Sequence, residues 1–356
     1  MSKPTPLPAP IPHPQRPSRR RLAVLPALFV LWLSSVPLAC LFGPAPLDAG
    51  DVLRALLGMG GDTAAMPAEA ARMVVTDIRL ARTALALLVG GSLAVAGVAM
   101  QGVLHNPLAE PFLLGVSSGA ALGAGLALCS ESALALAGQW STAHGAMMGA
   151  FLALGLSLAL GRGGGRDRLI LAGVAVSTMF GAGVSLLKAL DEESVSGIVF
   201  WIMGSFQGRG WHELPLALIP SLLGLVLLVP HWRTLDVLIM GDEDAAHLGV
   251  NVRRARLMAL IGAGCLTAGG VAVSGIIGFV GLVAPHILRR LMGPWHGPLL
   301  AAAWLVGGVF LLWADVAARC VLPYGQELPV GVITALVGGP FFALVLCAGT
   351  RSGARP

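Results

Sequence analysis

The strongest constraint on the fold is a series of long apolar runs that contain no charged residue. Most of them are close to the roughly 20 residues that an α-helix needs to cross a bilayer. The runs cover residues 22–42, 83–104, 112–130, 141–160, 169–187, 214–230, 257–273, 274–288, 298–314 and 329–350. They predict an all-α integral membrane protein with about ten transmembrane helices.

The composition agrees with a membrane protein. Hydrophobic residues make up 56% of the chain and charged residues 12%, and the mean hydropathy is +0.82. Soluble domains carry about 25% charged residues. The 48 glycines suit helices that pack closely in a membrane. The five cysteines show no paired spacing, so neither a disulfide framework nor a metal site is expected.

The distribution of basic residues predicts the orientation. An even number of helices places both termini on one side of the membrane. With a cytoplasmic N-terminus, 16 of the 23 basic residues lie inside and the other 7 outside, as the positive-inside rule requires. The arginines therefore indicate topology rather than nucleic-acid binding. The predicted organisation is a Pro/Arg-rich cytoplasmic tail (1–21), a ten-helix transmembrane domain (22–350) with a long cytoplasmic loop (233–256), and a short cytoplasmic tail (351–356).

A proline-containing break separates the second and third predicted helices. Pro107 and Pro111 forbid one continuous helix across residues 101–120, so this segment is expected to be a tight re-entry turn. The uncharged stretch from 257 to 288 is too long for one span and is expected to turn between Gly269 and Gly275. Helices 2–5 and 7–10 would run in opposite senses, and each set contains a glycine-rich hairpin, which indicates an inverted repeat.

Two residue patterns that are absent from the sequence indicate how transport by this chain could be driven. No Asp, Glu, Lys or Arg falls in the middle of a predicted span, whereas ion-coupled transporters usually place ionisable groups there. His144 is the only mid-membrane candidate, near a helix end. The sequence also has no Gly-x-x-x-x-Gly-Lys-[Ser/Thr] loop to hold phosphates. Active transport by this chain would therefore need a separate ATPase subunit.

The cytoplasmic loop contains one short predicted helix. Asp242, Glu243 and Asp244 suit its positive N-terminal end, and Gly249 suits its termination. From these residues alone, the segment is either a solvated connector or a docking element.

Seven segments, in order, resemble the permease subunits of vitamin B12, iron-siderophore and haem ABC importers. They are 77–83, 101–120, 200–206 with Trp211, 241–249, 274–286, 314–319, and 327–334 with 338–342. The resemblance implies a BtuC-like type II ABC importer fold and a non-catalytic permease with no permanently bound cofactor. It implies a homodimer with two ATP-binding cassette ATPase subunits and a periplasmic binding protein. The location it implies is the bacterial inner membrane, with both termini cytoplasmic.

The resemblance also implies roles for individual residues. Exposed arginines would receive carboxylates of the binding protein, and these are Arg79, Arg82 and Arg319; interfacial snorkelling is the alternative. The cytoplasmic gate would use Asn106, Leu108, Arg166 and Asp167, although the Asn-Pro turn could equally be only a cap and a break. The ATPase-coupling set would be Asp242, Glu243, Asp244, His247, Leu248 and Gly249.

The substrate is less constrained than the family. The resemblance places Gly173, Ser177, Met179 and Gly181 along the pathway, where simple helix packing is the alternative. Lys188 and Arg209 would flank the outer mouth and attract an acidic chelate, or would be plain interfacial charges. Haem is the first expectation, a ferric siderophore the second and cobalamin the third. An ion-coupled secondary transporter and a non-transporting scaffold are the rivals from other classes.

Overall fold

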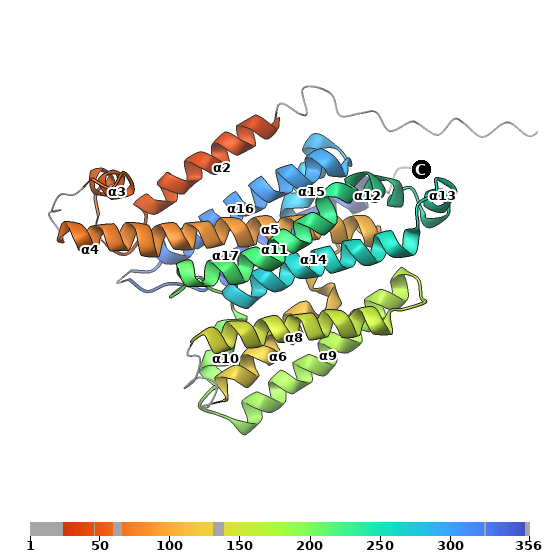
Figure 1. The fold of residues 1–356 in the computed structure, drawn as a ribbon, viewed down its shortest axis with the longest axis horizontal. Coiled ribbons are helices and arrows are strands. Elements are labelled where there is room, and N and C mark those ends of the chain that lie inside the picture. Colours follow the sequence, from red (N-terminus) through yellow and green to blue (C-terminus); the bar gives the residue numbers. More distant parts are fainter. Residues whose placement is uncertain (1–23, 46, 60–65, 131–138, 324, 353–356) are drawn as a thin grey trace, which may run out of the picture.

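The structure is a computed structural model that describes residues 24–45, 47–59, 66–130, 139–323 and 325–352 (Figure 1). The long helices of the described chain run roughly parallel to one another. They are α2 (Val24–Leu41), α5 (Ala81–Leu104), α8 (Gln139–Leu160), α9 (Arg166–Leu190), α11 (Leu214–Leu228), α14 (Val252–Ser274), α16 (His296–Cys320) and α17 (Val330–Ser352). Two shorter helices, α6 (Val116–Leu128) and α15 (Val280–Met292), complete the ten expected positions within these ranges.

Short elements join the long helices and mark the two ends of the bundle. The α3 end, at the left of Figure 1, carries α3 (Ala49–Leu56), α4 (Ala68–Met73) and α10 (Val195–Ile202). The opposite end, the α13 end, carries α12 (Trp232–Leu238) and α13 (Asp242–His247). The described chain begins in α2 and finishes in α17 at the α13 end. Both described ends therefore lie on one side, as the even helix count predicted.

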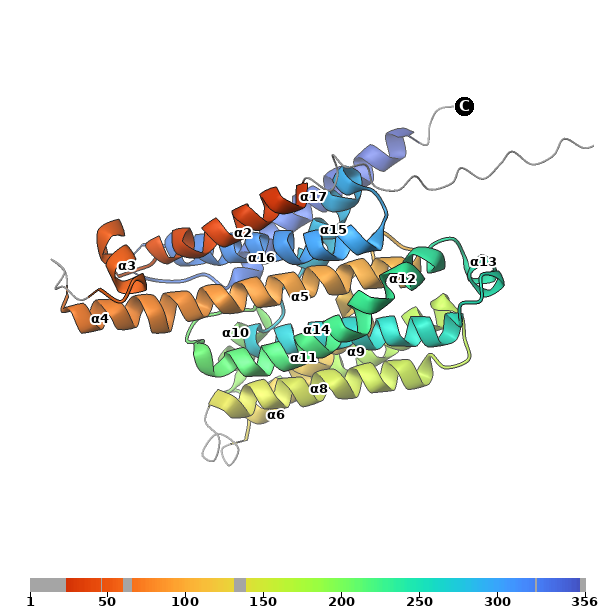
Figure 2. The ribbon, with the colours of Figure 1, turned by 45° about the horizontal axis from the view of Figure 1, so that its top comes forward.

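Helix α5 lies at the centre of the bundle, where it contacts α14, α15, α16 and α11 (Figure 2). It continues α4 through a π-helical turn, η1 (Val74–Leu80), and nearly every residue of α5 is buried. Glycine makes this burial possible. A Cβ atom at Gly97 would lie 1.8 Å from the backbone oxygen of Gly281 in α15. Only a residue without a side chain lets the two backbones approach so closely.

Both predicted breaks exist. The first runs from His105 through the 3-10 turn η2 (Pro111–Leu114) and ends at Gly115, whose φ is +75°. The second lies at 275–279, between α14 and α15, and not at Gly269–Gly270, which are buried inside α14. Gly275 (φ +70°) and Phe279 (φ +69°) have the left-handed backbone that ends one helix and redirects the chain into the next. The observed turn therefore begins at Gly275, the last residue of the expected segment, and continues to Phe279.

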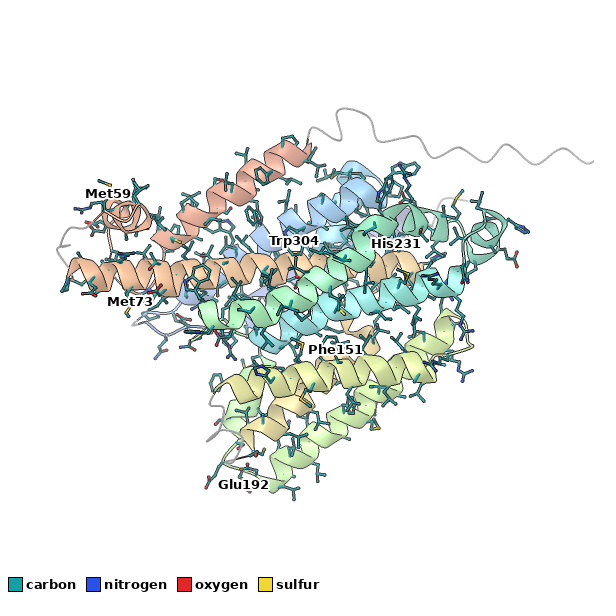
Figure 3. All side chains as sticks on the ribbon, in the orientation of Figure 1. Met59, Met73, Phe151, Glu192, His231 and Trp304 are labelled. Carbon is teal, nitrogen blue, oxygen red and sulfur yellow. The ribbon has the colours of Figure 1, made fainter. Side chains whose placement is uncertain are left out.

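The outer surfaces of the helices are apolar, as a lipid environment requires. Seven helical segments of the described chain are long and apolar enough to cross a membrane. Large apolar side chains project from them, including Phe151 on α8 (Figure 3), and Met148, Leu171 and Ile219 are all more than 60% exposed. In water, such a continuous apolar surface would cause aggregation.

Candidate functional site

Helix α13 presents most of its residues to the surroundings. The predicted helix is confirmed at Asp242–His247, and Gly249 follows it with a φ of +81°. Its only inward-facing apolar anchor among the described residues is Ala245, which is fully buried. The exposed face holds five of the six residues expected to couple to an ATPase, namely Glu243, Asp244, His247, Leu248 and Gly249. Leu248, the one large apolar side chain of this set, is 63% exposed.

The sixth residue, Asp242, faces the bundle instead. Its carboxylate accepts hydrogen bonds from Arg256 of α14, at 2.7 and 2.8 Å, and from Arg166 of α9, at 2.9 Å. Burial alone would raise the pKa of Asp242, but the hydrogen bonds from Arg256 and Arg166 outweigh it, so the pKa lies below its ordinary value. The carboxylate is therefore ionised at neutral pH. It bonds Asp242, which was expected to couple to an ATPase, to Arg166, which was expected in the gate.

The Asn-Pro turn lies beside this ionic cluster. Asn106 closes the turn, because its Oδ1 atom accepts a hydrogen bond from the backbone N–H of Leu108 at 2.9 Å. His105 ends α5 with a φ of +51°. Burial lowers the pKa of His105, and the neighbouring positive charge of Arg166 lowers it further. The structure thus brings Arg166, the turn and Asp242 together, whereas Asp167 is exposed at the start of α9.

The three arginines expected to dock a binding protein are buried at the α3 end. Arg82 donates hydrogen bonds to both carboxylate oxygens of Asp315, at 2.8–3.0 Å, and to Glu327 at 2.7 Å. Arg79 donates to the backbone oxygens of Cys40 and Ala45. Arg319 donates to the backbone oxygen of Ala39 and lies 3.7 Å from Asp315.

The expectation that these arginines are exposed was therefore wrong, because each is at most 5% exposed. Their buried partners were not assigned a role from the sequence. Asp315 and Arg319 are four residues apart on one helix, the spacing that places two side chains on the same face, and this was the available signal.

A further acidic residue was missed inside the bundle. Glu110 precedes η2, and its Oε1 atom accepts a hydrogen bond from the backbone N–H of Phe279 at 2.7 Å. It therefore joins the two chain breaks directly. Glu110 lies between the predicted spans 83–104 and 112–130, so it agrees with the absence of charged residues from the middle of any span. The sequence placed Glu110 within the re-entry turn of residues 101–120 but did not indicate a partner for its carboxylate.

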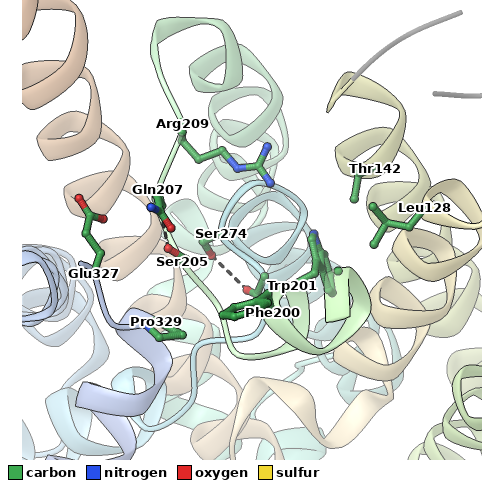
Figure 4. A pocket seen from close by; sticks show the side chains of 13 residues that line it. Leu128, Thr142, Phe200, Trp201, Ser205, Gln207, Arg209, Ser274, Glu327 and Pro329 are labelled. Carbon is green, nitrogen blue, oxygen red and sulfur yellow. Dashed lines mark hydrogen bonds between the residues drawn. The ribbon is translucent and has the colours of Figure 1, made fainter. Parts of the chain in front are cut away.

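A polar cavity of about 320 Å³ opens at the α3 end between α10, α14 and the segment that follows α10 (Figure 4). Its polar lining includes Ser205, Gln207, Arg209, Ser274 and Glu327. The expected mouth residue Arg209 lines this cavity and lies 3.8 Å from Glu213. Lys188, the other expected mouth residue, is near the end of α9 and is not part of the cavity lining. The structure therefore does not bring the two cations together.

The four expected pathway residues of α9 divide between two faces. Met179 is 51% exposed, and a Cβ atom at Gly181 would meet nothing within 4 Å. Gly173 is buried instead, because its Cβ position lies 1.9 Å from the backbone oxygen of Leu113 in η2. Ser177 is partly buried beside Gly115. Gly173 therefore serves helix packing, and the open face of α9 runs along Met179 and Gly181.

Comparison with known proteins identifies the architecture. The sequence profile of the FecCD transport family matches residues 28–348, which is nearly the whole described chain. The chain belongs to the FecCD transport family. A solved structure of a metal-chelate type ABC transporter in an inward-facing conformation matches this FecCD-family chain with a TM-score of 0.78 and 32% identity. The match covers 92% of this chain and 99% of that one.

Relatives of this FecCD-family chain are named for several substrates. The cobalamin import permease BtuC of Halobacterium salinarum is 40% identical over 78% of this chain and 74% of its own. The hemin transport permease HmuU of Yersinia pestis is 42% identical over 75% and 80%. The Fe(3+) dicitrate permease FecD of Escherichia coli is 39% identical over 77% and 85%. The sequence identities to these three permeases are nearly equal although their named substrates differ. The comparisons therefore establish the family and do not select a substrate.

Proposed function

We propose that this chain is the membrane permease of an ATP-driven importer that moves haem, or another ferric chelate, from periplasm to cytoplasm. Two copies would form the pathway, with two ATPase subunits at the α13 end and a periplasmic binding protein at the α3 end. The α13 end then faces the cytoplasm, in the bacterial inner membrane. ATP would act only through the partner subunit.

The observation that carries this proposal is the arrangement around α13. Its outer face is exposed and includes acidic side chains and Leu248, which suits docking of another subunit. Its inner face is bonded through Asp242 to Arg166, the first residue of α9. A displacement of α13 would therefore reach the helix that carries the open face of Met179 and Gly181. A solvated connector would not need this link, and neither would a passive scaffold.

The choice of haem rests on the charge in the cavity at the α3 end. Arg209 supplies a positive charge in the cavity at the α3 end, where haem propionates or an acidic siderophore would arrive. A ferric siderophore and cobalamin stay the alternatives within the family, because named relatives include permeases for each kind of substrate.

Reconstitution tests function and substrate together. The permease and its ATPase would be placed in liposomes with the matching binding protein, loaded in turn with haem, a ferric hydroxamate, ferric citrate or cobalamin. We expect ATP-dependent accumulation of haem above the other three. ATP-driven uptake of another chelate would keep the importer and replace the substrate. Uptake driven by an ion gradient without ATPase would overturn the proposal in favour of a secondary transporter.

Asp242→Ala is expected to separate ATPase binding from transport. The exposed docking face stays intact, so the ATPase should still co-purify, while the bonds to Arg166 and Arg256 are lost. Partly exposed ion pairs contribute up to about 1 kcal/mol, which is about a fivefold change in an equilibrium, so uptake per ATP hydrolysed should fall by up to about fivefold. The measurement is uptake and hydrolysis in the same liposomes.

Asp244→Ala is the matched control for this prediction. It removes the same charge from the exposed face of α13, so it should weaken ATPase binding without changing uptake per ATP. Arg166→Ala added to Asp242→Ala should cost little more than Asp242→Ala alone, because the two residues share one interaction. If Asp242→Ala instead releases the ATPase as Asp244→Ala does, Asp242 belongs to the docking face and the link to α9 has no role in coupling.

A further inference from the structure

A groove of about 660 Å³ lies between α8 and α14 at the α13 end, and its lining changes from apolar to basic along its length. The two helices touch where Leu154 lies against Gly264. They separate toward the α13 end, where the loop 161–165 closes the groove. The groove is distinct from the cavity at the α3 end, and none of the residues expected in the pathway lines it.

The apolar part of the groove runs along the helix sides. Leu158, Leu257, Leu260 and Ile261 form its walls, and these lie within the helices that cross the membrane. Gly155 opens the surface of α8, because a Cβ atom there would meet nothing within 4 Å. An acyl chain lying against α8 and α14 would therefore cover apolar surface without displacing any side chain.

The basic part of the groove is at the helix ends, where the headgroups of a bilayer lie. Arg162, Arg253 and Arg256 are among its lining residues, and no acidic residue of the described chain is. Arg256 is paired with Asp242, although its Nε atom is buried without a hydrogen-bond partner in the described chain. Arg162 and Arg253 are exposed, and no acidic partner for either occurs in the described ranges. Two uncompensated positive charges thus border the apolar wall.

From this arrangement we infer that the groove binds an anionic phospholipid such as phosphatidylglycerol. The phosphate would lie between Arg162 and Arg253, and one acyl chain would follow the wall formed by Leu257, Leu260 and Ile261. Basic pockets between transmembrane helices at a membrane interface are suited to anionic headgroups. A free phosphate would leave the apolar wall uncovered, and a zwitterionic lipid would leave the two positive charges without net compensation.

Lipid titration of the purified permease–ATPase complex tests this inference. The probes are phosphatidylglycerol and phosphatidylcholine with identical acyl chains, and bound lipid is counted by native mass spectrometry. We expect phosphatidylglycerol to bind the native complex in preference. Arginine near the membrane surface contributes about 1 kcal/mol toward an anionic lipid, so Arg162→Ala with Arg253→Ala should weaken its binding about thirtyfold.

Two further variants test the charge requirement and the acyl-chain wall separately. Arg254→Ala removes an adjacent charge outside the groove lining and should change the affinity little. Gly155→Phe fills the acyl part of the groove and should reduce binding of the lipid while every arginine is kept. Equal binding of the two lipids would overturn the inference, and so would an equal loss with Arg254→Ala. Dissociation of a permease dimer in the double variant would also overturn it, because the groove would then be a subunit interface.

Discussion

Arg82→Met is expected to destabilise the protein strongly. The change leaves Asp315, which is fully buried, without its bidentate partner. Removing one member of a buried ion pair costs about 3–5 kcal/mol, and we expect the lower value here because Arg319 stays 3.7 Å from Asp315. The midpoint of thermal unfolding of the purified protein in detergent should fall accordingly. Asp315→Asn added to Arg82→Met should recover part of the loss.

The same experiment separates the observed packing role of Arg82 from a docking role. Arg72→Ala is the matched control, because Arg72 is exposed in α4 at the same end. Its removal leaves no buried carboxylate of the described chain without a partner. If Arg82 acts by receiving a carboxylate of the binding protein, Arg82→Met will weaken that complex while the melting midpoint stays unchanged. That result would contradict the structural role that its buried hydrogen bonds indicate.

Gly123→Leu is expected to abolish the folded protein. Helices α6 and α8 contact each other through Gly119 and Gly123 on one side and Gly145 and Gly149 on the other. A Cβ atom at Gly123 would lie 2.0 Å from the backbone oxygen of Gly145. Gly123→Ala already forces the helices apart and should cost about 1–3 kcal/mol, and a leucine cannot be accommodated without separating them.

The control for this prediction is a glycine in the same helix pair with open space around it. Gly155→Ala should be neutral or stabilising, because Cβ meets nothing there and alanine favours a helix by about 1 kcal/mol over glycine. The amount of protein that elutes as a single folded species measures both variants. Equal behaviour of Gly123→Ala and Gly155→Ala would show that the α6–α8 contact is looser than the structure has it.

Periodicity and length predicted what depends on the membrane itself. The ten helices, the short helix α13 and the breaks after α5 and α14 follow from apolar runs, prolines and glycines, because the bilayer leaves few other solutions. Of the expected turn between Gly269 and Gly275, only Gly275 belongs to the observed break, since Gly269 and Gly270 looked like turn residues but lie inside α14. Their burial in α14 depends on close contact with α11 and α5, and such contacts exist only after the helices pack.

Side-chain partners were the least predictable part of the site. Arg82 and Asp315 are 233 residues apart in the sequence, so nothing local indicates that one neutralises the other. The exposure of Arg79 was inferred from its charge and its place at a helix end, and the carbonyl groups that surround it could not be foreseen. Asp242 was expected in the correct segment, but only the three-dimensional arrangement shows that it faces inward while its neighbours face outward.

The bond between Arg166 and Asp242 gives α9 the geometry of a lever. The helix has 25 residues, so at 1.5 Å per residue it is about 37 Å long. If the helix turns as a rod, a tilt of about 5° displaces its two ends relative to each other by about 3 Å. That displacement is close to the separation of two carbon atoms in contact, about 3.5–4.0 Å. The far end of α9 lies at the α3 end. In the proposed importer, a small displacement of α13 could thus be passed to the α3 end of α9 without unwinding any helix.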